Sequence, residues 1–122
     1  MDAEILKKLC NFIDESKITI NKNINLCKLI DSDGSLADRL NENANSFTTD
    51  FSKSYTDFKK HLSIPDNINK AFEKFIKDIR ESLESIGTFP MFFKSILIEL
   101  DAIDELLNRH KDTDDGLIIA GS

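Results

Sequence analysis

A run of oxygen-bearing side chains begins at Asp31 and ends at Glu42. Oxygen ligands stand at positions 1, 3 and 5 of this run and a carboxylate stands at position 12, as in a helix–loop–helix calcium site. The sharp turn of such a loop needs glycine at position 6, where this chain has Leu36, and Asp38 occupies the hydrophobic position 8. A turn that ends one helix and caps the next explains the same residues, so we expect no calcium site.

The histidines and cysteines do not follow a metal-binding or nucleophilic pattern. His61 and His110 follow Lys or Arg near the expected ends of helices, where a cation complements the helix dipole. Cys10 and Cys27 lack the spacing of a zinc or redox pair. Two reduced, buried thiols are the simpler interpretation, and one bridge between the first two elements is the alternative. We therefore expect no metal, no cofactor and no enzymatic activity.

Acidic residues concentrate near the C-terminal end. The 122 residues include 22 acids and 16 Lys plus Arg, and residues 99–115 hold seven acids against Arg109 and Lys111. A chain with net charge -6 and no basic stripe is unsuited to nucleic acid. Three of these acids lie off the apolar stripe of the last predicted helix, and three more continue the acidic surface beyond its predicted end. We call them the acidic ridge: Asp101, Asp104, Glu105, Asp112, Asp114 and Asp115. The ridge is either a solvated face that keeps the protein soluble or a surface for a basic protein.

Large apolar side chains crowd the start of the same helix. Residues 89, 91, 92 and 93 are all apolar and go all round a helix, so they cannot all face a core. Exposed apolar groups mark contact sites. Met91 and Phe92 therefore join the acidic ridge as candidate partner-binding residues. The other Phe-rich stripes favour core packing, with a ligand pocket or partner groove as the alternative.

Three periodic segments predict helices over residues 35–62, 65–86 and 89–110, with apolar residues recurring every three or four positions. Gly87 is a natural C-terminal cap, and Thr88 can cap the helix that follows. The last two helices have a matched length of about 33 Å, and their short joint predicts an antiparallel hairpin. We expect the last helix to stop within residues 111–116. A short apolar tail, 117–122, then docks on the bundle, pairs as a strand with another chain or hangs free.

The first thirty residues are harder to interpret. Residues 5–13 predict a short amphipathic helix that ends near Ser16. Residues 18–30 fit either a hairpin around Asn21-Lys22-Asn23 or a second helix. We favour the helix, because an isolated hairpin in a helical chain has no sheet to join.

These patterns together predict an all-α, single-domain bundle of four to five helices over residues 1–116, with a C-terminal antiparallel helical hairpin. No apolar run approaches the length of a transmembrane helix, and the acidic start lacks the features of a secretory signal. We expect a cytoplasmic protein, with signal-free secretion as the alternative. The expected function is a non-enzymatic protein-binding module of the immunity-protein, inhibitor or secretion-adaptor type that uses the acidic C-terminal helix surface. The alternative is a structural protein that forms a homo-oligomer through its Phe and Leu stripes.

Overall fold

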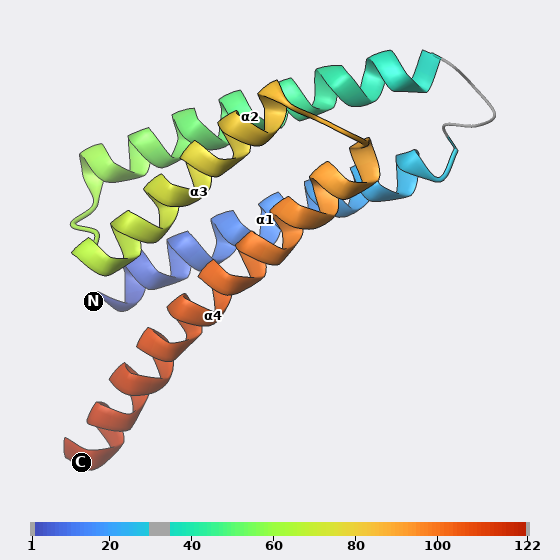
Figure 1. Cartoon of the computed structure of the whole chain (residues 1–122). Helices are drawn as coiled ribbons and strands as arrows, with labels where there is room; N and C mark the ends of the chain where they lie inside the picture. Colours follow the sequence, from blue (N-terminus) through green and yellow to red (C-terminus); the bar gives the residue numbers. More distant parts are fainter. Residues whose placement is uncertain (1, 30–34, 122) are drawn as a thin grey trace.

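Four helices make up the chain in the computed structural model, which describes the backbone of residues 2–29 and 35–121 and the side chains of residues 2–29 and 35–110. They are α1 (Ala3–Cys27), α2 (Ser35–His61), α3 (Asp66–Glu84) and α4 (Phe89–Gly121) (Figure 1). No strand occurs in the described part of the chain. The prediction of an all-helical bundle of four to five helices is consistent with this architecture.

α1 is one continuous helix, so the predicted end near Ser16 is wrong. Positions at alternate spacings of three and four are buried along its whole length: Leu6, Leu9, Ile13, Ser16, Ile20, Asn23 and Cys27. Because Ser16 and Asn23 are polar, the apolar periodicity looks interrupted in the sequence. The Ser16 hydroxyl donates to the Phe12 carbonyl oxygen at 2.8 Å, which pairs this buried group within its own helix. The helical interpretation of residues 18–30 is confirmed as far as Cys27, and the hairpin alternative is wrong.

α2 and α3 lie close to their predicted ranges. Pro65 precedes the first residue of α3 and Asp66 supplies the acid in its first turn, where the helix dipole favours a negative charge. α3 ends earlier than expected, because the N–H of Ser85 donates to the Ser82 carbonyl oxygen and closes the last turn. The C-terminal cap of α3 is Ser85, so the prediction that Gly87 caps this helix is wrong, and Gly87 does not have the positive φ typical of such a cap.

α4 begins as predicted and continues past its predicted end. The Thr88 hydroxyl accepts a hydrogen bond from the Met91 N–H at 3.3 Å, which confirms Thr88 as the cap. The expected stop within residues 111–116 is wrong, because α4 runs to Gly121. Charged residues are compatible with a helix, and a single internal glycine such as Gly116 costs only about 1 kcal/mol. The backbone of the predicted tail therefore belongs to α4 as far as Gly121, and α3 and α4 are unequal in length.

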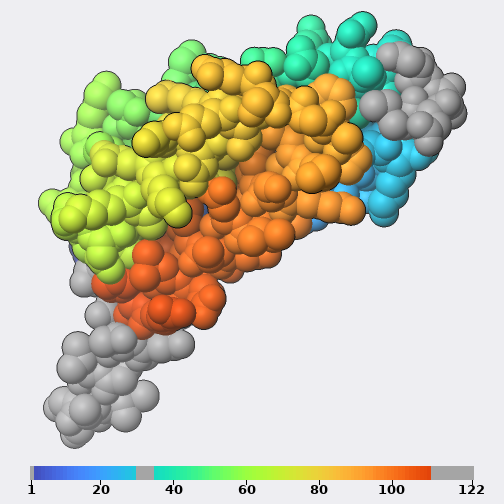
Figure 2. Space-filling view, viewed as in Figure 1, coloured from blue at the N-terminus to red at the C-terminus, as the bar shows by residue number. Residues whose placement is uncertain are grey.

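Each helix packs against its neighbour in the chain, and α4 also packs against α1, which closes the bundle. The α1–α4 contact is the most extensive of the four, and the two helices run in opposite directions (Figure 1). α3 and α4 also run in opposite directions, and together they cover one face of the molecule (Figure 2). Figure 2 also shows α2 passing behind α3 at the rim of this face.

Aromatic side chains fill the centre of the bundle. The Phe12 ring lies 4.6 Å from that of Phe51, and the Tyr55 ring stacks on Phe72 at 4.4 Å. The fully or nearly fully buried aromatic residues are Phe47, Phe51, Tyr55, Phe72, Phe75, Phe92 and Phe93. Their burial confirms the prediction that the Phe-rich stripes form the core. The stripes considered for self-assembly are therefore largely occupied within the chain.

Candidate functional site

Two carboxylates of the acidic ridge contact a lysine of the first helix. The Lys17 ammonium lies 2.8 Å from Asp101 Oδ1 and 2.9 Å from Asp104 Oδ2. The side chain of Asp104 is only 25 % exposed, whereas that of Asp101 is 60 % exposed. Burial lowers the pKa of Lys17, but hydrogen bonds and the charges of both aspartates outweigh it, so the pKa is raised above its usual value. These acids thus hold α1 against α4, which the sequence pattern did not indicate.

The rest of the acidic ridge divides into a paired residue and three that fall outside the described side chains. Glu105 lies 2.9 Å from Arg109 one turn later on α4, and both side chains are well exposed. Asp112, Asp114 and Asp115 lie within α4, but their side chains are outside the described residues. Within residues 99–110 the ridge is therefore largely balanced by cations of the chain itself.

Met91 and Phe92, adjacent in sequence, point to different environments. Phe92 is 5 % exposed and packs edge to face on Phe93, with ring centres 5.1 Å apart. It belongs to the core and not to the surface on which the sequence placed it. Met91 is 69 % exposed. The expectation that not every apolar residue here faces inward thus applies to Met91.

Ile98 is a surface residue that sequence reasoning missed. It is 70 % exposed, more than any other large apolar side chain in the described part of the chain. It lies seven residues after Met91, and Glu105 lies seven residues further on, so all three share one line along α4. The seven-residue spacing from Met91 was the available signal.

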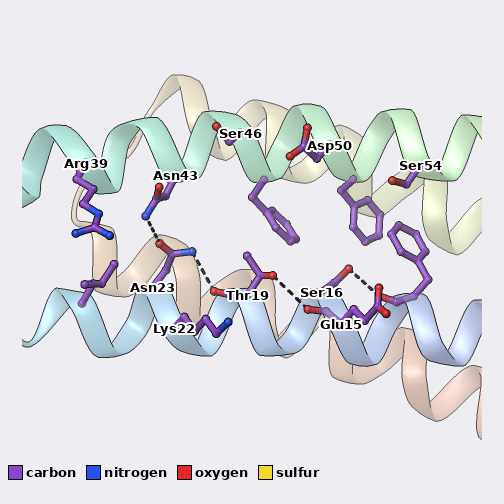
Figure 3. Close-up of a pocket in the computed structure, with 14 residues that line it drawn as sticks. Glu15, Ser16, Thr19, Lys22, Asn23, Arg39, Asn43, Ser46, Asp50 and Ser54 are labelled. Carbon is purple, nitrogen blue, oxygen red and sulfur yellow. Dashed lines mark hydrogen bonds between the residues drawn. The ribbon is translucent and has the colours of Figure 1, made fainter.

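An open groove separates α1 from α2. These helices contact each other much less extensively than α1 contacts α4. Two adjoining hollows of about 460 Å³ and about 670 Å³ share Phe12, Glu15 and Ser54, so they form one continuous feature. Figure 3 shows Arg39, Asp50 and Ser54 of α2 on one side, and residues of α1 on the other. We call this feature the α1–α2 groove.

Short polar side chains keep the groove open above its aromatic floor. The hydroxyl of Thr19 donates to the Glu15 carbonyl oxygen of its own helix, so it needs no partner across the groove. One polar contact crosses between the walls: the Asn43 amide donates to Asn23 Oδ1 at 2.8 Å (Figure 3). Asn23 is only 4 % exposed, so this bond fixes the register of α1 against α2.

The residues with possible metal or nucleophilic chemistry remain apart. Cys10 and Cys27 are seventeen residues apart on one helix, about 25 Å by helical rise, which is too far for a disulfide between them. His110 contacts the Asn67 side chain at 3.1 Å inside α4, not at a helix end as predicted. Among the described residues no cluster of His, Cys, Asp and Glu is arranged to hold a metal ion. Part of the run from Asp31 to Glu42 lies outside the described residues.

Comparison with known proteins finds no matching family, no matching curated protein and no matching solved structure. None of the helices, over the residues described, combines the length and the apolar character needed to cross a membrane.

Proposed function

We propose that this chain is a non-enzymatic protein-binding module that contacts its partner through the outer face of α4. We define this face by Met91, Ile98, Asp101 and Glu105. The observation that supports the proposal is the exposure of Met91 and Ile98, at 69 % and 70 %, two turns apart on one line of the helix. Fully burying such a side chain is worth about 1.5–3 kcal/mol, so the two together would supply part of the free energy of association.

The carboxylates beside this anchor favour a basic partner. Asp101 is three residues and Glu105 seven residues beyond Ile98, and both side chains stay at least 60 % exposed while paired. A partner cation has to compete with Lys17 and Arg109 for them. The carboxylates would therefore contribute mainly to the association rate and to orientation, in a salt-dependent manner. An inhibitor or adaptor that covers a basic patch, with a cytoplasmic location, fits this proposal.

The experiment is an affinity capture from the native host with three forms of the chain. The wild type and Ile98→Lys are compared with Ile18→Lys, which alters another exposed isoleucine, at 56 %, on α1. We expect a specific protein to be recovered with the wild type and with Ile18→Lys but lost with Ile98→Lys, while circular dichroism shows all three to be folded. Equal recovery of the partner protein by the two variants would show that the outer face of α4 does not bind it.

A further inference from the structure

Three acidic side chains line the α1–α2 groove, two of them near its middle and one toward the end bordered by His61. Glu15 comes from α1, and Asp50 and Asp57 come from α2. The contact between Asn23 and Asn43 sets the antiparallel register, which puts Glu15 and Asp50 at nearly the same level. None of the three carboxylates has a cation within ion-pair distance among the residues that the structure describes.

Positive side chains line the opposite end of the groove. Lys22 of α1 and Arg39 of α2 both border it, as Figure 3 shows. By the same register, Lys22 lies about 10 Å and Arg39 about 17 Å along the axis from Glu15 and Asp50. Neither cation has a carboxylate partner within the described part of the chain. Lys8 also lines the acidic end, but it is paired with Glu4 at 3.9 Å, so it is the unpaired charge that changes sign along the groove.

The floor between these charges is aromatic. Phe12 is half-buried and stacks on Phe51 at 4.6 Å, and its ring centre lies 5.1 Å from that of Phe58, also half-buried. Phe47 and Leu26 line the end nearer to Arg39. A partner can therefore cover the partly exposed side chains of Phe12, Phe58 and Leu26 along the axis while its polar side chains meet the charged walls.

The walls determine the form of the occupant. Both are helices, whose backbone donors and acceptors are paired internally between the first and last turns, so no edge is offered to an extended strand. Side chains at helical spacing, in contrast, pack between two helices as a third helix. From the level of Lys8 to that of Arg39 the groove is about 28 Å long, which matches about five helical turns.

We infer that the α1–α2 groove binds an amphipathic helix of a partner protein. The basic residues of that helix lie over Glu15, Asp50 and Asp57, and its acidic residues, at one end only, lie over Lys22 and Arg39. Its apolar stripe covers the partly exposed side chains of Phe12, Leu26 and Phe58. This site is separate from the outer face of α4, so it stands or falls independently of the proposed function.

Two synthetic helical peptides of about five turns test the inference. Both carry the same Leu and Phe stripe. The first has acids in its initial two turns and bases in the rest. The second has acids at all of these positions, so that neither direction of binding places bases over Glu15, Asp50 and Asp57. Fluorescence anisotropy with the full chain should show the first peptide binding at least about tenfold more tightly than the second. Binding of both peptides within about twofold, or of neither at submillimolar concentration, would overturn the inference.

Charge reversal on the protein provides the second arm. The double variant Glu15→Lys with Asp50→Lys should weaken the first peptide by at least about tenfold and strengthen the second. The matched control is Asp14→Lys with Glu42→Lys, which makes the same change in charge at exposed positions that do not line the groove. The control should keep the wild-type preference. Loss of preference in both variants, with helical circular dichroism retained, would contradict a site in the groove.

Discussion

Lys17 of α1 donates a hydrogen bond to Asp104 of α4 at 2.9 Å, across the most extensive helix contact in the bundle. Residues 87 positions apart in the sequence are joined here. The same lysine also contacts Asp101. The C-terminal helix is thus held to the N-terminal helix by charge as well as by its apolar face. Part of the acidity that looked available to a partner serves the fold.

Replacing Lys17 with methionine should lower the free energy of unfolding by about 1–2 kcal/mol, because Asp104 is left partly buried without its cation. The control is Lys8→Met, which removes a much more exposed pair with Glu4, 3.9 Å apart, and should change stability by less than about 0.5 kcal/mol. Urea titration of both variants measures the difference. Equal losses of stability in the two variants would show that the contact of Lys17 with α4 stabilises the protein no more than an exposed ion pair does.

Replacing Glu99 with glutamine should stabilise the protein near neutral pH. Burial, then the charge of Asp78 and a hydrogen bond with it, raises the pKa of Glu99. The folded state therefore holds the proton of the Glu99 carboxyl more tightly than the unfolded state does. The free energy of unfolding falls as pH rises from the ordinary glutamate pKa through the raised pKa of the folded state. The variant should therefore have a higher melting temperature than the wild type at pH 7 but not at pH 3.5. Glu84→Gln, at an exposed position of α3, should show no such pH-dependent gain.

The bond between Asn23 and Asn43 should appear as a coupling energy of about 1 kcal/mol in a double-mutant cycle with alanine. Each single variant leaves a buried or partly buried amide without its partner on the other helix. Asn45→Ala is the control, because the Asn45 amide donates to a carbonyl oxygen of its own helix and is exposed. Chemical denaturation of the four forms gives the coupling, and a value near zero would mean that the bond does not set the register.

Tyr55 should resist ionisation until the protein unfolds. Its side chain is 1 % exposed and its hydroxyl donates to Asn69 Oδ1 at 2.7 Å. Burial, with a smaller effect of Glu73, raises the pKa of Tyr55 well above its usual range. Since Tyr55 is the single tyrosine of the sequence, phenolate absorbance reports it directly. We expect the phenolate absorbance to rise and the helical circular dichroism signal to fall at the same pH, above about pH 10. Ionisation near pH 10 with the fold intact would contradict this burial.

The sequence predicted the helices whose core positions are apolar without interruption. In α2 and α3 the stripes of Phe, Leu and Ile are regular, and their ranges were nearly correct. α1 was divided in error because Ser16 and Asn23 take core positions and pair their polar groups locally or across to α2. The continuation of α4 past residue 110 was not predicted, because glycine commonly ends a helix and Gly116 was taken as such an end. One glycine inside a long helix, however, destabilises it only slightly.

The candidate surfaces were less predictable because they depend on how the helices pack. Nothing in the local pattern shows that Lys17 faces Asp101 and Asp104. The burial of Phe92 and the exposure of Ile98 depend on the rotation of α4 against its neighbours, which a run of apolar residues does not define. The α1–α2 groove arises where short side chains of two distant segments meet.

The central claim is that the outer face of α4 contacts a protein partner. Its most direct test is methyl nuclear magnetic resonance of the full chain, titrated with the protein that the wild type recovers from its host. We predict that the methyl signals of Met91 and Ile98 shift or broaden in proportion to bound partner, while that of Ile18 does not. A partner that binds and leaves the signals of Met91 and Ile98 unchanged would contradict the claim.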